Sequence, residues 1–271
     1  MGKKWLNNKT IVITGASSGI GKELTKLFIK QNNCHVIGVA RSQEKIEKLI
    51  AELGNYANKF EYRLFDVGVQ QNWEDFAKSI NKPIDLLINN AGMFYKFDNF
   101  LNVPLQTGKQ IMDTNFYSVV YGCKHMLPKI NKNGGIVNIC SSDALIAVAG
   151  TNYYAASKGA VKSFTQSLAG EFSNYYIGCM LPGFTDTDIF RDVQFNNKEA
   201  RLLKKFISSC SKISKKIYNA ILKRKQYKVV GYDAKFFNFL AKTNMANGAK
   251  LINGVLQKTK LDIFSTVKYK N

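Results

Sequence analysis

A glycine-rich turn near the N-terminus restricts the fold of this 271-residue chain more than any other feature. The apolar, β-branched residues 10–13 indicate a short buried strand, and residues 22–29 have the spacing of an amphipathic helix. Between them, residues 14–21 have the pattern Thr-Gly-x3-Gly-x-Gly. Glycines let the backbone approach a pyrophosphate, and a helix start offers N–H groups to it. A strand, a glycine turn and a helix in this order predict a dinucleotide site, or otherwise a plain strand–helix turn.

Strand and helix patterns continue to alternate along the chain. Further strands are expected at residues 34–40, 60–65, 86–89, 135–140, 176–181 and 227–231. This alternation predicts an α/β fold, a doubly wound parallel sheet of the Rossmann-like type with about seven strands. The length suits one domain over residues 1–271, with a C-terminal helical extension at 232–271.

A tyrosine and a lysine, Tyr154 and Lys158, lie four residues apart on a predicted helix and therefore share one face. A free tyrosine has a pKa of about 10, and a nearby positive charge lowers it. At ~4 Å and an effective dielectric of ~20, the attraction is about 4 kcal/mol, which lowers the pKa by roughly three at most. The pair is therefore a candidate general acid–base, although this spacing also occurs on ordinary surface helices.

Six motifs in order resemble those of the short-chain dehydrogenase/reductase family in its single-domain form. They span roughly residues 9–190 and include N-N-A-G at 89–92, Tyr-x3-Lys at 154–158 and Pro-Gly at 182–183. Cys140 replaces the first serine of the family's common Ser-Ser pair, and Tyr153 has the wrong spacing to the lysine. Ser142 is an adjacent alternative to the serine thirteen residues before Tyr154. The resemblance implies a catalytic set of Asn115, Ser141, Tyr154 and Lys158.

The resemblance also implies a set of cofactor contacts. Arg41 stands at the end of the second predicted strand. An acidic residue at this position would accept hydrogen bonds from the ribose hydroxyls of NAD, whereas the guanidinium of an arginine suits a phosphate. NADP(H) is therefore favoured over NAD(H). Ser18, however, stands where many NADP-preferring relatives carry a second basic residue. The alternative interpretation is that Arg41 is a solvated loop residue. The implied contacts are Gly15, Ser17, Ser18, Gly19, Ile20, Gly21, Arg41, Asp66, Val67, Asn90, Ala91, Gly92, Tyr154, Lys158, Pro182, Gly183, Thr185 and Thr187.

The resemblance implies an NADPH-dependent reductase in which Tyr154 protonates a substrate carbonyl oxygen as hydride reaches the carbon. Ser141 would bind that oxygen, Lys158 would lower the Tyr154 pKa and hold the nicotinamide ribose, and Asn115 would anchor a water. A hydrophobic ketone, such as a 3-oxoacyl chain, a steroid or a long-chain ketone, suits the apolar residues expected at the mouth: Met93, Phe94, Tyr95, Phe97, Ile146, Val148, Phe184 and Phe190. The alternatives are an NAD(P)-dependent alcohol dehydrogenase and a non-catalytic NADP(H)-binding sensor. Family analogy implies a homo-oligomer, either a dimer or a tetramer.

The formal net charge of +20 is unevenly distributed. Residues 188–271 contain 19 Lys and Arg against 5 Asp and Glu, a net charge of +14. This excess would attract an acidic carrier or an anionic membrane surface, whereas solvated helix faces are the simpler interpretation. A basic interaction protein acting at membranes or nucleic acid is the corresponding non-enzymatic alternative, but nucleic acid is not the expected partner. The family resemblance places a mobile substrate lid at 188–226.

Cysteine and histidine usage restricts the remaining possibilities. Five scattered cysteines and two histidines favour neither a disulfide framework nor a metal site. The sequence shows no apolar run near the ~20 residues of a membrane span and no secretory signal, so a reducing cytoplasm is the expected location.

Overall fold

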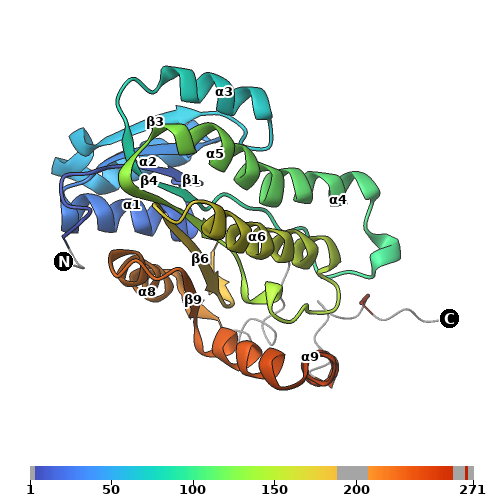
Figure 1. Cartoon of the computed structure of the whole chain (residues 1–271). Helices are drawn as coiled ribbons and strands as arrows, with labels where there is room; N and C mark the ends of the chain where they lie inside the picture. Colours follow the sequence, from blue (N-terminus) through green and yellow to red (C-terminus); the bar gives the residue numbers. More distant parts are fainter. Residues whose placement is uncertain (1–3, 188–206, 259–265, 268–271) are drawn as a thin grey trace.

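The computed structural model describes residues 4–187, 207–258 and 266–267. Seven parallel strands form the central sheet in the order β3-β2-β1-β4-β5-β6-β9, which confirms the predicted fold class (Figure 1). The strand order reverses between β1 and β4, and in such sheets a ligand cleft forms where the strands end at this point. The strands are β1 Thr10–Thr14, β2 His35–Ala40, β3 Phe60–Leu64, β4 Ile84–Asn89, β5 Ile130–Ile139, β6 Tyr176–Pro182 and β9 Tyr227–Val230.

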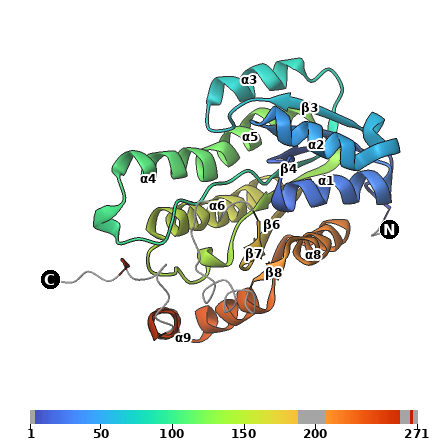
Figure 2. The ribbon, with the colours of Figure 1, turned by 180° about the vertical axis from the view of Figure 1, so that it is seen from behind.

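Helices cover both faces of the sheet (Figure 2). Along β1, Ile11 and Ile13 pack into one buried cluster with α1, α2 and α8, whereas Val12 packs into the opposite cluster with α3, α5 and α6. Alternate residues of a strand face opposite sides, so a doubly covered strand is apolar throughout. The helices are α1 Gly19–Asn32, α2 Gln43–Leu53, α3 Gln70–Ser79, α4 Leu105–Met112, α5 Ser118–Met126, α6 Asn152–Glu171, α8 Cys210–Leu222 and α9 Tyr232–Lys258.

Short segments complete the described chain. The 3-10 helices are η1 Gly54–Lys59, η2 Phe100–Asn102, η4 Leu127–Lys129 and η5 Ser142–Ala144, and η3 Asp113–Tyr117 is a π-helical turn. A two-stranded parallel sheet joins β7, Thr185–Asp186, to β8, Ser208–Ser209.

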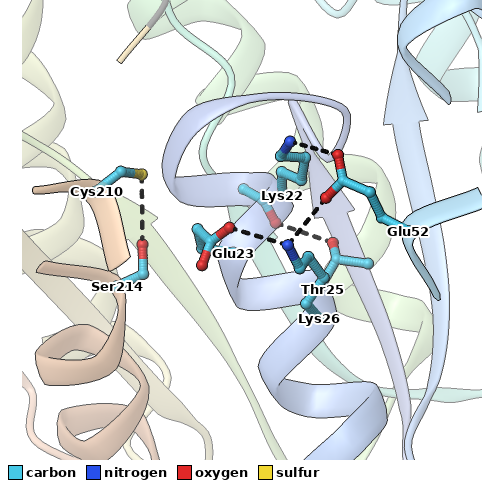
Figure 3. Close-up of polar contacts among 8 residues, drawn as sticks. Lys22, Glu23, Thr25, Lys26, Glu52, Cys210 and Ser214 are labelled. Atoms are coloured by element: carbon cyan, nitrogen blue, oxygen red, sulfur yellow. Dashed lines mark hydrogen bonds and ion pairs between the residues drawn. The ribbon is translucent and has the colours of Figure 1, made fainter. Parts of the chain in front are cut away.

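Helix α1 is linked to α2 by ion pairs (Figure 3). Lys22 and Lys26 each lie 2.9 Å from a carboxylate oxygen of Glu52, and Lys26 also lies 3.4 Å from Glu23. The Thr25 hydroxyl donates to a backbone carbonyl one turn earlier, at 2.9 Å. These contacts direct both α1 lysines toward Glu52, and they hold the helix that follows the glycine turn against its neighbour.

Helix α8 falls in the region 188–226, where a lid was predicted, and one of its faces is part of the core. Ile213, Ile217 and Ile221 are fully buried, because their four-residue spacing places them on one face against α1. Tyr218 donates to Asn32 Oδ1 at 2.6 Å, and near the start of α8 Cys210 Sγ lies 3.9 Å from a serine hydroxyl (Figure 3). The lid residues 188–206 lie outside the described part of the chain.

The predicted C-terminal helical extension is confirmed as α9 over residues 232–258, and residues 259–265 and 268–271 lie outside the described part of the chain. Its backbone departs from helical geometry at Asn244 (φ −157°, ψ 99°), where the chain bends. Ala234 and Phe237 are buried, and the first half of α9 packs beside β9. Within the ranges described, no helix combines the length and apolar content needed to span a membrane.

Candidate active site

A cleft of about 380 Å³ opens beyond the ends of the central strands. Five of the predicted site residues are not part of its lining: Ser17, Gly21, Asp66, Val67 and Asn115. The structure brings the others together around the cleft: Gly15, Ser18, Gly19, Ile20, Arg41, Asn90, Ala91, Gly92, Ser141, Tyr154, Lys158, Pro182, Gly183, Thr185 and Thr187.

The glycine turn and the end of β4 form one polar unit. Gly15 has a positive φ of 65°, a conformation that favours glycine. Thr14 Oγ1 accepts from the backbone N–H groups of Asn90 and Ala91, both at 2.9 Å, and Asn90 Nδ2 donates to the Thr14 carbonyl at 2.9 Å. A Cβ on Gly21 would lie 2.2 Å from the Gly15 carbonyl oxygen. Gly21 therefore serves close packing behind the turn, which explains its absence from the cleft lining.

Two cations line the rim where β2 ends. The Arg41 side chain is 69% exposed and lies 3.9 Å from Asp66 Oδ2. Asp66 Oδ1 accepts from the Gly68 N–H at 2.8 Å, so this carboxylate also shapes the turn after β3. Lys45, which the sequence analysis did not single out, lines the same rim, and its backbone N–H donates to the Ser42 hydroxyl at the start of α2. The pair of basic residues gives this end of the cleft a positive charge.

Asn115 lies behind the cleft wall rather than in the lining. It is fully buried in the π-helical turn η3, a feature that is frequent near functional sites. Its Oδ1 accepts from the Met93 N–H at 2.7 Å, and its Nδ2 donates to the Met93 carbonyl at 2.9 Å and to Ser157 Oγ at 3.1 Å. Asn115 thus joins the loop after β4 to α6 and positions both. Val67 is likewise buried, in the core beside Trp73.

Tyr154 and Lys158 both reach the cleft from α6. Tyr154 forms a hydrogen bond with Ser141, and its ring meets Phe94 edge-on at 5.3 Å between centroids. Lys158 Nζ donates to the Ile139 carbonyl at 3.2 Å and lies 5.9 Å from the centroid of the Tyr154 ring. The neighbouring Tyr153 packs against α4, where a Cβ on Gly108 would lie 2.4 Å from its ring. The helix therefore directs Tyr154, and not Tyr153, toward Ser141.

Burial dominates the electrostatics of this pair. It raises the pKa of Tyr154, whose hydrogen bond with Ser141 acts in the opposite direction, and it lowers the pKa of Lys158. Lys158 was expected to lower the pKa of Tyr154, but desolvation of the buried phenol is the larger effect, so the pKa of Tyr154 is raised instead. Tyr154 is consequently protonated at neutral pH, which is the form required of a general acid.

A buried carboxylate, Asp143, lies beside Tyr154 and was missed by sequence reasoning. Its Oδ1 accepts from the Val148 N–H at 2.8 Å, and its Oδ2 accepts from Thr151 Oγ1 at 2.7 Å. Burial raises the pKa of Asp143 to about 7, and its negative charge raises the pKa of Tyr154. The only sequence signal was an acidic residue just before an apolar run, with no motif around it.

A second missed carboxylate, Asp233, holds the Pro-Gly loop. The Phe184 N–H donates to Asp233 Oδ2 at 2.6 Å, and the Gly183 N–H donates to the Val230 carbonyl at 2.8 Å. A Cβ on Gly183 would lie 2.1 Å from Asp233 Oδ2, so glycine is required where the loop meets the carboxylate. Burial raises the pKa of Asp233. The start of α9 therefore sets the shape of the cleft wall at Pro182.

The other end of the cleft is apolar. Phe237 of α9 belongs to this wall and was not predicted. Three of the apolar residues expected at the mouth are not among the lining residues. Tyr95 lies beside Lys96, and Ile146 is buried behind the lining. Phe190 falls outside the described ranges. The apolar lining includes Met93, Phe94, Phe97, Val148, Phe184 and Phe237.

Comparison with known proteins identifies the family. The family model for short chain dehydrogenases matches residues 9–198. Dehydrogenase/reductase SDR family member 7B of Xenopus laevis is 32% identical over 198 residues, which are 68% of this chain and 61% of that protein. The 3-oxoacyl-[acyl-carrier-protein] reductase FabG of Chlamydia pneumoniae is 33% identical over 208 residues, covering 73% of this chain and 82% of the relative.

The fold is also shared with solved structures. A short-chain dehydrogenase from Shigella flexneri 2a strain 301, solved with NADP, superposes with a TM-score of 0.73 at 23% identity, covering 83% of this chain and 96% of that one. At 23% sequence identity, this similarity shows a shared fold only. The family assignment comes from the family model, which matches well over half of the chain. The protein belongs to the short-chain dehydrogenase/reductase family of oxidoreductases.

Proposed function

We propose that this protein is an NADPH-dependent reductase that converts a hydrophobic ketone to an alcohol. The observation that carries the proposal is the position of Tyr154. Its hydroxyl meets Ser141 in the polar part of the cleft, while its ring meets Phe94 at the apolar end. Burial keeps the phenol protonated, which favours proton donation and hence reduction. The C. pneumoniae relative carries the name of a reductase.

The polar part of the cleft fits a dinucleotide phosphate. The α1 helix begins at the glycine turn, and Ser18, Gly19 and Ile20 at its start line the cleft. Arg41 and Lys45 supply positive charge at the rim. Two cations suit the additional phosphate of NADP(H) better than the diol of NAD(H). A reduced nicotinamide, when bound, supplies the hydride. The NADP found in the S. flexneri structure is consistent with this choice.

The residues of this chain then have separate tasks. Ser141 donates a hydrogen bond to the substrate carbonyl oxygen, and Tyr154 gives that oxygen its proton. Lys158 is held in place by the Ile139 carbonyl, and its remaining N–H bonds would be available to a ribose hydroxyl of the cofactor. Asn115 acts as a positioning residue through Met93 and does not touch the reacting atoms.

The apolar end determines the substrate class. Aromatic and aliphatic side chains from four separate segments line it, so the group beside the carbonyl is expected to be apolar. A 3-oxoacyl thioester, a steroid ketone and a long-chain aliphatic ketone are the three arms of a substrate panel. Phe237 contributes to this end from α9, and an enlarged pocket in Phe237→Ala should change the ranking of the three.

The test is consumption of NADPH followed at 340 nm with this panel. Tyr154→Phe should lower kcat by ~10²-fold or more, since a general acid contributes ~10²–10⁴-fold, while NADPH binding measured by fluorescence is retained. Tyr153→Phe is the matched control and should have little effect, because that ring packs on α4. A Tyr154→Phe enzyme with more than about a tenth of the wild-type kcat would contradict the assignment.

The same assays separate the alternatives. Faster turnover of alcohols with NADP⁺ than of ketones with NADPH would support the dehydrogenase direction. Tight NADPH binding without turnover of any ketone or alcohol would support a sensor. Both results would overturn the proposed reduction.

We also propose a homo-oligomer and a cytoplasmic location. Leu101 and Leu105 are strongly exposed in and before α4, and Tyr117 is exposed where it stacks on Tyr121, so these side chains offer an apolar contact for a second subunit. Light scattering after size exclusion would give the subunit number. All five cysteines are free thiols, which suits a reducing compartment.

A further inference from the structure

The first half of α9, before its bend at Asn244, has two unlike faces. Ala234 and Phe237 point inward and are buried. On the opposite face Tyr232, Phe236 and Phe239 are 81%, 50% and 61% exposed. Their spacing of four and three residues places them along one line of the helix, here called the aromatic stripe. Past the bend, Met245, Leu251 and Val255 are also at least half exposed.

Positive charge surrounds the aromatic stripe. Lys216 Nζ of α8 lies 5.1 Å from the centroid of the Tyr232 ring, and Lys235 Nζ lies 6.0 Å from it. Lys242 is exposed one turn further along the same face. Residues 207–258 contain eleven Lys and Arg and one acidic residue, Asp233, whose carboxylate is directed inward to the Phe184 N–H. Helices α8 and α9 lie together along the lower edge of the molecule in both views (Figures 1 and 2).

We propose that the aromatic stripe and the lysines around it dock this protein onto an anionic lipid surface. Exposed aromatic rings favour the boundary between headgroups and acyl chains, and each nearby lysine is attracted by anionic headgroups. Binding of an interfacial helix strengthens with its apolar contact area and with its attraction to anionic lipids, and this face can supply both. The helix would lie in the plane of the surface, with Phe237 facing the protein.

A second copy of the chain fits this face poorly. A two-fold contact would place the same patch on both sides and bring Lys216, Lys235 and Lys242 against their own copies. With a single inward-directed carboxylate among residues 207–258, the described part of this face offers no compensating charge. Acidic lipid supplies that charge and also accepts projecting rings without a preformed groove. Charge complementarity therefore favours lipid over self-association.

The docked orientation has a consequence for the cleft. Phe236 and Phe237 are adjacent residues that point in different directions from α9, one on the exposed face and one in the apolar cleft wall. Docking therefore brings the apolar end of the cleft close to the lipid surface. This consequence rests on the proposed function, whereas the docking itself does not.

Co-sedimentation of the full chain with vesicles tests the docking. The vesicles contain phosphatidylcholine alone or with 30 mol% phosphatidylserine, at low and at physiological salt, and no cofactor or substrate is added. The wild type should bind the anionic vesicles at low salt, bind neutral vesicles much more weakly, and lose affinity as salt rises. Because no turnover is measured, failure of the proposed reductase activity would leave this result unaffected.

Two double variants with matched controls locate the surface. Lys216→Glu with Lys235→Glu should weaken binding about tenfold or more, whereas Lys109→Glu with Lys132→Glu makes the same change in net charge elsewhere and should have a much smaller effect. Phe236→Ser with Phe239→Ser should also weaken binding about tenfold. Its control is Leu64→Ser with Val69→Ser, a pair of exposed apolar residues near β3, at the opposite edge of the sheet from β9.

Circular dichroism melts confirm that each variant is folded. Three results would overturn the proposal. They are absence of binding to anionic vesicles at low salt, equal losses in the stripe variants and their controls, and conversion of an oligomer to a smaller one by the stripe variants without loss of lipid binding.

Discussion

Replacing Asp143 by asparagine isolates the free energy of holding a carboxyl group in the cleft wall. Asparagine has nearly the same shape, and its Oδ1 can still accept from the Val148 N–H. Its amide can donate to Thr151 Oγ1, because the Thr151 hydroxyl has a second acceptor, the Val148 carbonyl at 2.8 Å, to which it can donate instead. The substitution therefore removes the charge while it leaves the hydrogen bonds of this turn in place.

The magnitude follows from the pKa of Asp143, which burial raises from 3.8 to about 7. Between these pH values the native state keeps a proton that the unfolded state has lost, so the free energy of unfolding falls as the pH rises. Over the whole window the loss is about 4 kcal/mol, at ~1.4 kcal/mol per pH unit, and it is complete above the folded pKa. Asparagine does not titrate, so Asp143→Asn should gain stability relative to the wild type by about 3 kcal/mol between pH 5 and pH 8.

Urea unfolding followed by tryptophan fluorescence at several pH values measures this difference, since Trp73 is fully buried. Asp75→Asn is the matched control, because it makes the same chemical change at a carboxylate whose side chain is 63% exposed. The variant should also shift the basic limb of the pH–rate profile to lower pH, because the Asp143 charge raises the Tyr154 pKa.

Two results would refute the reasoning on Asp143. One is a stability difference between Asp143→Asn and the wild type that stays constant from pH 5 to pH 8. The other is a difference that moves in favour of the wild type as the pH rises, because it would mean that the fold stabilises the ionised carboxylate.

Three further substitutions test the rest of the site. Arg41→Asp should weaken NADPH use and improve NADH use, since it replaces a phosphate partner by an acceptor for the ribose hydroxyls. An unchanged ratio of kcat/KM for the two cofactors would mean that Arg41 does not bind the phosphate. Gly21→Ala should lower the free energy of unfolding by ~1–3 kcal/mol, because its Cβ would meet the Gly15 carbonyl at 2.2 Å; a thermal melt like that of the wild type would contradict this packing. Asp233→Ala should lower the free energy of unfolding by ~1–3 kcal/mol and raise the KM for cofactor, because the Phe184 N–H loses its acceptor. Asp233→Asn keeps an acceptor oxygen and should largely restore both values. Equal defects in the two variants would assign the effect to something other than that hydrogen bond.

Sequence patterns were sufficient for the framework of this protein. Apolar runs and helical periodicity predicted a sheet that the structure confirms with seven parallel strands, because burial on both faces requires strands that are apolar throughout. The spacing of glycines predicted the turn after β1, and four-residue spacing distinguished Tyr154 from Tyr153. These features are local, and the chain within one or two turns determines which face a side chain occupies.

Only the tertiary structure decided which distant residues complete the site and what charge they carry. Asp233 meets Phe184 across 49 positions of sequence, and Phe237 reaches the cleft from the C-terminal helix. Asn115, which the family resemblance placed in the catalytic set, lies behind the cleft wall. The pKa values of Tyr154 and Asp143 follow from burial, and burial is set by every segment packed around a group rather than by its neighbours in sequence.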